Sequence, residues 1–188
     1  MPTGATRMKC QRQPPAWKLI SLLMITAFCS LGLPGCRGYS YTLNERVVYE
    51  PPKLFRDYRI DDANLRACVM QAIEDQRITA AAALQDLNCS NAGILELGGI
   101  EVFTQLRRLG LDGNKISDIT PLLGLRQLEL LQLHDNSLRR VGTQLCEGAK
   151  KKVALAGNAA LDCARLPALA ACGVQLLDVP EHCAAAAQ

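Results

Sequence analysis

The chain has 188 residues, with 21 lysines and arginines against 18 aspartates and glutamates and a formal net charge of +3. Four of the basic residues precede Cys36, in a segment that the sequence predicts to be removed on export; the remaining 17 basic and 18 acidic residues give a net charge of about −1. A near-neutral domain has no electrostatic drive toward a phosphate backbone, which excludes nucleic acid as the expected partner.

Residues 1–35 have the layout of a secretory signal peptide. Basic residues without any acidic one come first, and an uncharged run follows from Leu19 to Leu33. This run is shorter than the roughly 20 residues that a membrane-spanning helix needs, so a permanent span is the weaker interpretation.

The uncharged run ends in Leu-Pro-Gly-Cys at 33–36, which resembles the lipobox of bacterial lipoproteins, although Pro34 departs from the residue types usual there. The resemblance implies cleavage before Cys36 and acylation of this residue, which would anchor the protein in a membrane through several acyl chains. Arg37 replaces the Asp that retains such proteins in the inner membrane of enterobacteria-like systems, so the resemblance favours the outer membrane of a bacterial cell envelope. Residues 30–32 fit ordinary signal peptidase, and a plain secreted protein is the alternative.

Two segments precede the repeats described below. Residues 36–57 show neither a repeat nor a helical stripe, and we interpret them as a lipid-anchored tether that the pair Pro51-Pro52 stiffens. Residues 58–83 predict an N-terminal helical cap, which begins at Asp61 or Asp62 and would cover the open end of a repeat array. Its inward positions are Leu65, Cys68, Val69, Ala72 and Ile73.

Residues 84–162 repeat at one fixed spacing, and their apolar positions stay in one register. A fixed period of about 22 residues predicts a solenoid whose units stack on their neighbours. The two clearest units, at 106–116 and 128–138, follow the pattern LxxLxLxxNxL and resemble the leucine-rich repeat. The Ser-Asp-Ile-Thr-Pro-Leu stretch at 117–122 resembles the short bacterial repeats of internalins.

This resemblance implies an α/β solenoid, a short arc of about four units with parallel strands on a concave face and 3₁₀ turns or coil on the convex face. The residues Asn114, Asn136 and Asn158 fall where each unit turns sharply. Their amides can bond backbone groups of adjacent turns, so they predict an asparagine ladder. Residues 163–188 form the expected C-terminal cap and tail.

Six cysteines lie in the predicted mature domain, an even set that indicates disulfides in an exported protein. Spacing alone does not choose among the pairings, but the register places some of them at a cap or in the core. A zinc site that also uses His182 is the alternative, which the lack of a CxxC pair disfavours. The favoured pairs are Cys68 with Cys89, Cys163 with Cys183 in what resembles a disulfide-closed C-terminal cap, and, by elimination, Cys146 with Cys172.

Catalytic motifs are missing from this sequence. Its two histidines, His134 and His182, lie outside any recognised catalytic pattern, and no GxSxG, HExxH or phosphate-binding glycine loop is present. We therefore predict that the protein is not an enzyme and uses no cofactor. The register places His134 on the concave side, either as an ordinary exposed polar residue or as a partner or pH-sensitive contact.

The resemblance to leucine-rich repeats implies that residues facing out from the concave strands bind other proteins. The sequence therefore predicts a non-enzymatic, envelope-tethered module for an unidentified protein partner, although the face lacks the aromatic anchors usual at strong interfaces. A structural or spacer lipoprotein without a concave ligand is the alternative. The candidate contact residues are Arg108, Asp112, Gln132, His134 and Lys152.

Overall fold

The computed structural model describes residues 41–43, 46–49, 51–148 and 150–186. The chain divides into two compact units, residues 1–52 and 53–188. The predicted signal segment and Cys36 lie outside the described residues. Within the described part of the chain, no helix is both long enough and apolar enough to span a lipid bilayer.

The described part of the first unit is a β-hairpin. Strand β1 (Tyr41–Leu43) pairs antiparallel with β2 (Arg46–Tyr49). The sequence predicts a tether here and no strand, so this hairpin is an addition to the predicted fold. Tyrosine, threonine and valine dominate these two strands, and aromatic and β-branched residues favour extended backbone even in a segment without a repeat.

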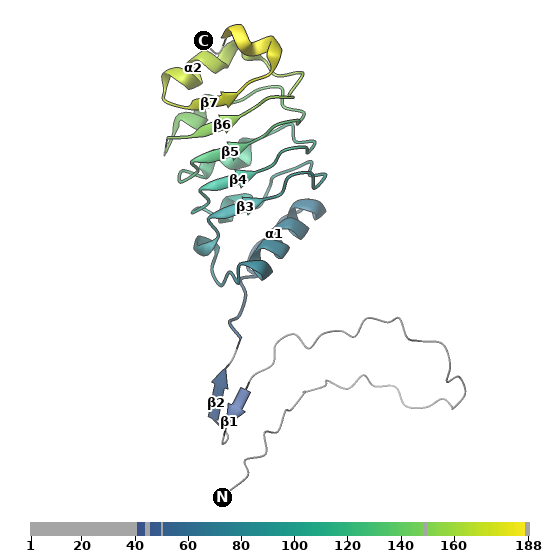
Figure 1. The fold of residues 1–188 in the computed structure, drawn as a ribbon, viewed down its shortest axis with the longest axis vertical. Coiled ribbons are helices and arrows are strands. Elements are labelled where there is room, and N and C mark those ends of the chain that lie inside the picture. The colour runs from purple at the N-terminus through teal and green to yellow at the C-terminus, as the bar shows by residue number, and fades with distance from the viewer. Residues whose placement is uncertain (1–40, 44–45, 50, 149, 187–188) are drawn as a thin grey trace, which may run out of the picture. The chain divides into compact units, whose positions relative to one another are not determined.

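The second unit is built around one parallel sheet, in the strand order β3-β4-β5-β6-β7 (Figure 1). Neighbouring strands β3 to β6 pair in the register of the sequence repeat, which aligns Asp86, Arg108, Leu130 and Lys152 in one row. The short repeat solenoid that the sequence predicted is therefore the observed fold. The strands are β3 (Asp86–Asn88), β4 (Arg108–Gly110), β5 (Leu130–Gln132), β6 (Lys152–Ala154) and β7 (Gln175–Asp178).

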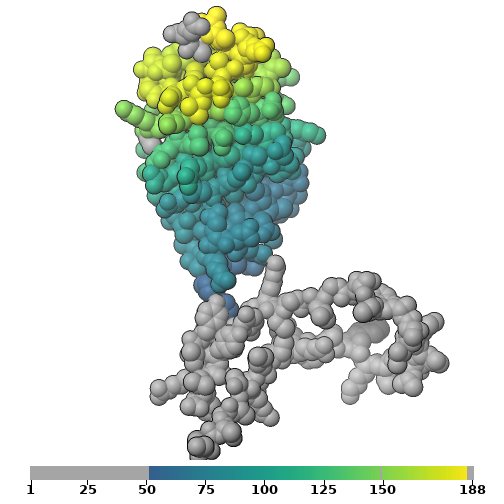
Figure 2. Space-filling view, in the orientation of Figure 1, coloured from purple at the N-terminus to yellow at the C-terminus, as the bar shows by residue number. Residues whose placement is uncertain are grey.

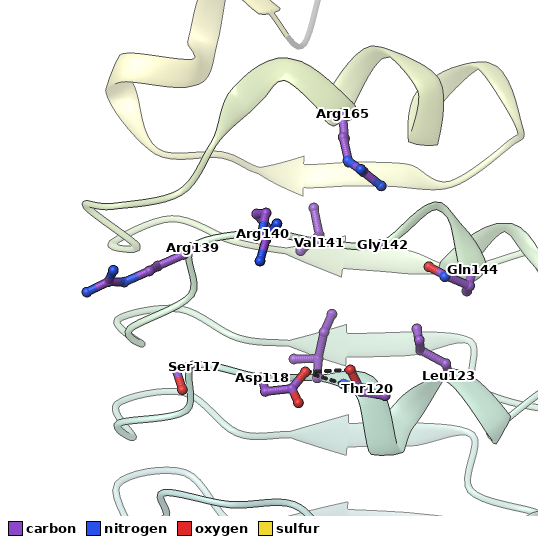
Figure 3. Close-up of a pocket in the computed structure, with 11 residues that line it drawn as sticks. Ser117, Asp118, Thr120, Leu123, Arg139, Arg140, Val141, Gly142, Gln144 and Arg165 are labelled. Atoms are coloured by element: carbon purple, nitrogen blue, oxygen red, sulfur yellow. Dashed lines mark hydrogen bonds between the residues drawn. The ribbon is translucent and has the colours of Figure 1, made fainter.

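A short 3₁₀ turn precedes each of the strands β3 to β6: η1 (Ala81–Ala83), η2 (Ile100–Val102), η3 (Thr120–Gly124) and η4 (Thr143–Cys146). Leucines and isoleucines from strands and turns fill the space between them, and most have no more than 3% of their surface exposed. Figure 2 shows successive layers along the second unit in chain order, and Figure 3 shows Thr120 and Gln144 in the turns of successive layers.

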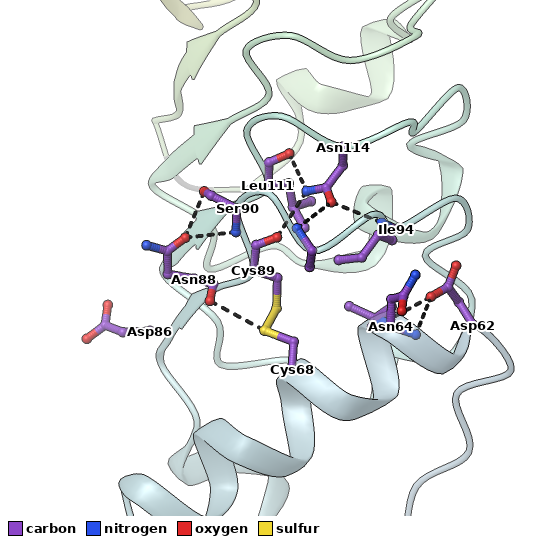
Figure 4. Close-up of a disulfide and its surroundings, with 12 residues drawn as sticks. Asp62, Asn64, Cys68, Asp86, Asn88, Cys89, Ser90, Ile94, Leu111 and Asn114 are labelled. Carbon is purple, nitrogen blue, oxygen red and sulfur yellow. Dashed lines mark hydrogen bonds between the residues drawn. A yellow bond between two sulfur atoms is a disulfide. The ribbon is translucent and has the colours of Figure 1, made fainter.

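The first layer is covered by helix α1 (Ala63–Asp75), whose buried side consists of Leu65, Val69 and Ile73 (Figure 4). Asp62 caps the helix: its Oδ1 accepts the amides of Asn64 and Leu65, both at 2.9 Å. Its Oδ2 accepts two amides of the first repeat, at residues 95 and 96. One carboxylate therefore starts the helix and ties it to the solenoid.

An aromatic cluster extends this cap toward the N-terminus. Phe55 and Tyr58 pack on buried Phe103, with ring centroids 6.1 and 5.7 Å away. The backbone amide of Phe55 also donates to the carbonyl of Ile78 at 2.8 Å. The chain thus joins the core before residue 58, where the sequence analysis placed the start of the cap.

The three asparagines lie buried in equivalent turns and bond the backbone across layers; Figure 4 shows the first of them, Asn114. Asn114 accepts the amide of Ile94 at 3.0 Å and donates to the carbonyls of Cys89 and Leu111 at 3.0 and 2.8 Å. Equivalent bonds one and two layers further on are made by Asn136 and Asn158. These amides satisfy backbone groups that would otherwise be buried without a partner.

The C-terminal end is closed by η5 (Cys163–Arg165), helix α2 (Leu166–Ala171), strand β7 and η6 (Glu181–Ala186). The cap is where the sequence predicts it, but β7 adds a fifth strand to the main sheet that the sequence did not predict. Gln175 and Leu176 of β7 pair with Lys152 and Val153 of β6. The cap therefore supplies polar side chains to the same sheet as the repeats.

Among the residues that the structure describes there are three disulfides, which join the cysteines in the pairs that the sequence favoured: Cys68–Cys89, Cys146–Cys172 and Cys163–Cys183. The first links α1 to the first repeat (Figure 4), and the other two hold the C-terminal cap.

Candidate functional site

The candidate site is the outward face of the parallel sheet, where side chains stand in rows across the strands. Because residues two apart in a strand point to the same side, each strand contributes two or three outward positions. One row runs through Asp86, Arg108, Leu130, Lys152 and Gln175, and the next through Asn88, Gly110, Gln132, Ala154 and Asp178. The rows therefore bring the predicted contact residues Arg108, Gln132 and Lys152 onto one face, while Asp112 and His134 follow just beyond the ends of β4 and β5.

Arg108 is paired across the sheet. Its Nε and Nη2 donate to the two carboxylate oxygens of Asp86, the second at 2.7 Å. This forked hydrogen bond holds the pKa of the Asp86 carboxyl below its usual range. Both side chains remain exposed, so the pair adds little to stability and fixes the position of the guanidinium instead.

A second ion pair, which the sequence did not predict, joins Arg107 to Glu129. Arg107 donates from Nε and Nη2 to Oε1 of Glu129, at 3.0 and 2.6 Å. The two residues are one repeat period apart in the sequence and therefore neighbours in adjacent layers. A charge pair at the repeat spacing was the signal that could have revealed it.

His134 lies between two carboxylates. Its Nδ1 is 3.2 Å from Oδ1 of Asp112, and its Nε2 is 3.4 Å from Oδ2 of Asp178. The same Asp112 oxygen accepts the backbone amide of His134 at 2.8 Å. Asp178 was not a predicted site residue because it comes from β7, outside the regular repeats. The imidazole therefore connects a repeat to the C-terminal cap.

Gln132 and Lys152 differ from these paired residues. Within the described part of the chain, neither side chain has a hydrogen-bond or ion-pair partner within bonding distance. Gln132 is flanked in its row by Gly110 and Ala154, which have no long side chains. A Cβ at residue 110 would lie only 2.8 Å from Oδ1 of Asn88, so a larger residue there would require this side chain to shift. The centre of the face thus offers an amide and an ammonium group for new contacts.

Cys163, His182 and Cys183 are the metal-ligating side chains that the structure gathers among its described residues, with ligand atoms within 4.8 Å of one another. The two sulfur atoms are bonded to each other in a disulfide. The ring Nε2 of His182 lies 2.9 Å from the carbonyl oxygen of Leu161. Disulfide sulfurs are not thiolate ligands, so this arrangement does not support the zinc alternative.

Comparisons with known proteins agree with this fold. No family model matches the chain. Leucine-rich repeat-containing protein 56 of Mus musculus is 39% identical over 72 residues, which are 36% of this chain but only 13% of that protein's length. Internalin C2 of Listeria monocytogenes aligns with a TM-score of 0.51 and 24% identity, over 63% of this chain and 55% of its own. A second internalin from that organism, inlF, has a TM-score of 0.46 and 24% identity, over 51% and 30%.

Proposed function

We propose that this chain is a non-enzymatic, envelope-tethered module that binds a protein partner on the outward face of its parallel sheet. The leucine-rich repeat fold suggests a protein-interaction module in general terms. The observation that carries the finer proposal is the row structure of the sheet, which sets Arg108, Gln132 and Lys152 on adjacent strands. Adjacent strands are about 5 Å apart, so these side chains form one continuous patch.

The patch suits a polar partner surface. Arg108 is held by Asp86 with its guanidinium exposed, while Gln132 and Lys152 lack partners of their own among the described residues. Asp112 and His134 border this centre. Because the paired groups are already fixed in position, little side-chain entropy is lost when a partner binds them.

The contact face is tested by site-specific photo-crosslinking in the intact envelope. A photoreactive amino acid at position 132 should crosslink one defined partner, whereas the same group at position 115 on the opposite face should not. The purified partner should then bind the Arg108→Ala, Gln132→Ala and His134→Ala triple variant at least about tenfold more weakly, since these changes remove central polar contacts. Unchanged affinity for the triple variant would overturn the assignment of this face.

Envelope tethering rests on the Leu-Pro-Gly-Cys sequence at 33–36 and on the three disulfides, which suit an oxidising compartment. The Cys36→Ser variant should accumulate as an uncleaved precursor and should not incorporate labelled fatty acid. Cys10→Ser serves as the matched control because this cysteine lies inside the predicted signal. Labelling that survives Cys36→Ser would refute lipidation.

One observation favours the second candidate, a spacer lipoprotein without a ligand on this face. Several polar groups of the sheet contact each other: Arg108 pairs with Asp86, Arg107 pairs with Glu129, and the ring nitrogens of His134 lie within 3.4 Å of two carboxylates. The crosslinking experiment separates the two candidates, since a spacer predicts no stoichiometric crosslink at position 132.

A further inference from the structure

A second surface feature lies on the turn side of the solenoid, away from the sheet. It is a groove of about 730 Å³ between the turns of two repeats and the C-terminal cap. Three arginines line it: Arg139 and Arg140 precede η4, and Arg165 ends η5 (Figure 3). Figure 3 shows Arg165 extending from its own layer toward the layer that carries Arg140.

These three guanidinium groups have no carboxylate partner within ion-pairing distance among the described residues. Other arginines of the same domain do: Arg107 and Arg108 are paired on the sheet, as described above. The guanidinium groups of Arg140 and Arg165 face the groove, whereas Arg139 extends outward from its rim (Figure 3). Together these exposed, unpaired groups form a positive patch on a domain whose overall charge is close to zero.

The two acidic residues beside the groove each accept hydrogen bonds from their own turn through one carboxylate oxygen. Oδ1 of Asp118, which lines the groove, accepts the amide and the hydroxyl of Thr120 at 2.8 and 2.6 Å. These bonds lower the pKa of the Asp118 carboxyl. Asp162 accepts the amide of Ala164 at 3.0 Å in the equivalent turn two layers further on. Neither carboxylate forms an ion pair with the three arginines.

The remaining lining is mixed. Leu123 is half-buried, Ile119 and Val141 form a buried apolar floor, and Ser117 and Gln144 supply polar groups at the sides. The volume lies within the range of about 300–1,000 Å³ typical of ligand sites, and is too large for one small ion to fill. An extended peptide could place apolar side chains on the floor and its backbone beside the polar groups.

We propose that this groove binds an acidic, extended peptide segment of a protein partner. Carboxylates of the peptide pair with Arg139, Arg140 and Arg165, because the planar guanidinium fork matches a carboxylate with two parallel hydrogen bonds. The site is separate from the sheet face, and its test does not depend on the partner proposed there.

The test uses the chain from residue 37 onward, which omits the predicted signal segment and Cys36. The probe is a fluorescein-labelled peptide of alternating Asp and Leu residues. Its Asn and Leu counterpart of equal length is the peptide control. The acidic peptide should bind, should lose affinity as the salt concentration rises, and should bind the Arg139→Glu, Arg140→Glu, Arg165→Glu variant at least about tenfold more weakly. The Asn peptide should not bind.

A matched variant controls for net charge. Lys53→Glu, Arg56→Glu and Arg77→Glu change the charge by the same amount at exposed positions near the N-terminal cap, and should leave binding within about twofold. Circular dichroism and urea unfolding should show that both variants are folded. Equal weakening in both variants would overturn the proposal, as would the absence of binding.

Two further arms distinguish other anions. Inorganic phosphate that displaces the acidic peptide at low millimolar concentration would assign the groove to phosphate groups and overturn the peptide proposal. Binding to vesicles of phosphatidylglycerol, lost in the groove variant, together with no binding of the peptide, would assign it to lipid headgroups instead. The sheet variant Arg108→Ala, Gln132→Ala, His134→Ala should bind the peptide normally, because it leaves the groove intact.

Discussion

Removing one amide of the asparagine ladder should destabilise the whole repeat domain. Asn114 is 5% exposed and forms three hydrogen bonds of 3.0 Å or less with the buried backbone groups of Ile94, Cys89 and Leu111. Each buried group that loses its partner costs about 1–3 kcal/mol. With partial relaxation, Asn114→Ala should lower the free energy of unfolding by about 3–5 kcal/mol. A typical domain has only about 5–15 kcal/mol in total.

Urea unfolding of the disulfide-bonded repeat domain measures this loss. With a slope of about 2 kcal/mol per molar urea, the midpoint should fall by about 1.5–2.5 M. Asn88→Ala is the matched control: its side chain is exposed and, among the described residues, accepts hydrogen bonds from Ser90 alone, so its loss should stay below about 1 kcal/mol. An Asn114→Ala loss below about 1 kcal/mol, or one equal to the control, would refute the account of the ladder.

Three further predictions concern the N-terminal cap. Asp62→Ala should lower the free energy of unfolding by about 1–2 kcal/mol at neutral pH. Burial would raise the pKa of Asp62, but hydrogen bonds from four backbone amides outweigh burial and lower this pKa. The difference in unfolding free energy from wild type should therefore shrink as the pH falls below 3.8, and a difference that stays constant would contradict this cause. Replacing Cys68 and Cys89 together by Ser should cost about 3 kcal/mol in thermal or urea unfolding, and no loss would show that the bridge does not stabilise the cap. Gly99→Ala should lower the free energy of unfolding by about 1–3 kcal/mol, because Gly99 has φ +94° and a Cβ there would collide with the carbonyl of Arg59. The control is Gly98→Ala, which should be tolerated because a Cβ at residue 98 meets no atom.

The constant repeat period made the solenoid fold predictable. Once one strand position is assigned, the same register assigns the others, as the alignment of Leu87, Leu109, Leu131 and Val153 in neighbouring strands shows. The ladder follows from the same rule, because a buried turn needs its backbone groups satisfied. The cap helix was predictable from a different period, and the structure selects Asp62 from the two capping residues that the sequence offered, Asp61 and Asp62.

Features that break the period could not be predicted in this way. Strand β7 follows α2 outside the repeat spacing, so the contact between Asp178 and His134 is not visible in the repeat alignment. The hairpin of β1 and β2 lies outside the repeats altogether. The arginine groove was also missed, since it depends on which turn residues lack partners, and this is decided by hydrogen bonds rather than by residue type.

The repeat register explains why Arg140 is unpaired, and this leads to a last prediction. Asp118 and Asp162 occupy the equivalent position in the layers on either side, and each bonds the amide two residues further on in its own turn. An arginine has no acceptor for the equivalent amide of Gly142, so Arg140→Asp should restore this bond and stabilise the domain by about 0.5–1 kcal/mol in urea unfolding.

The same substitution should weaken binding of the acidic peptide, because it removes one guanidinium and places a carboxylate in the groove. Arg140→Ala separates the two effects: it should weaken binding without a gain in stability, since alanine cannot accept the amide. Arginine at position 140 would thus favour binding in the groove but forgo the turn bond that Asp118 and Asp162 make in the adjacent layers. If Arg140→Asp lowers stability, or leaves peptide affinity unchanged, the link between turn geometry and the free guanidinium is wrong.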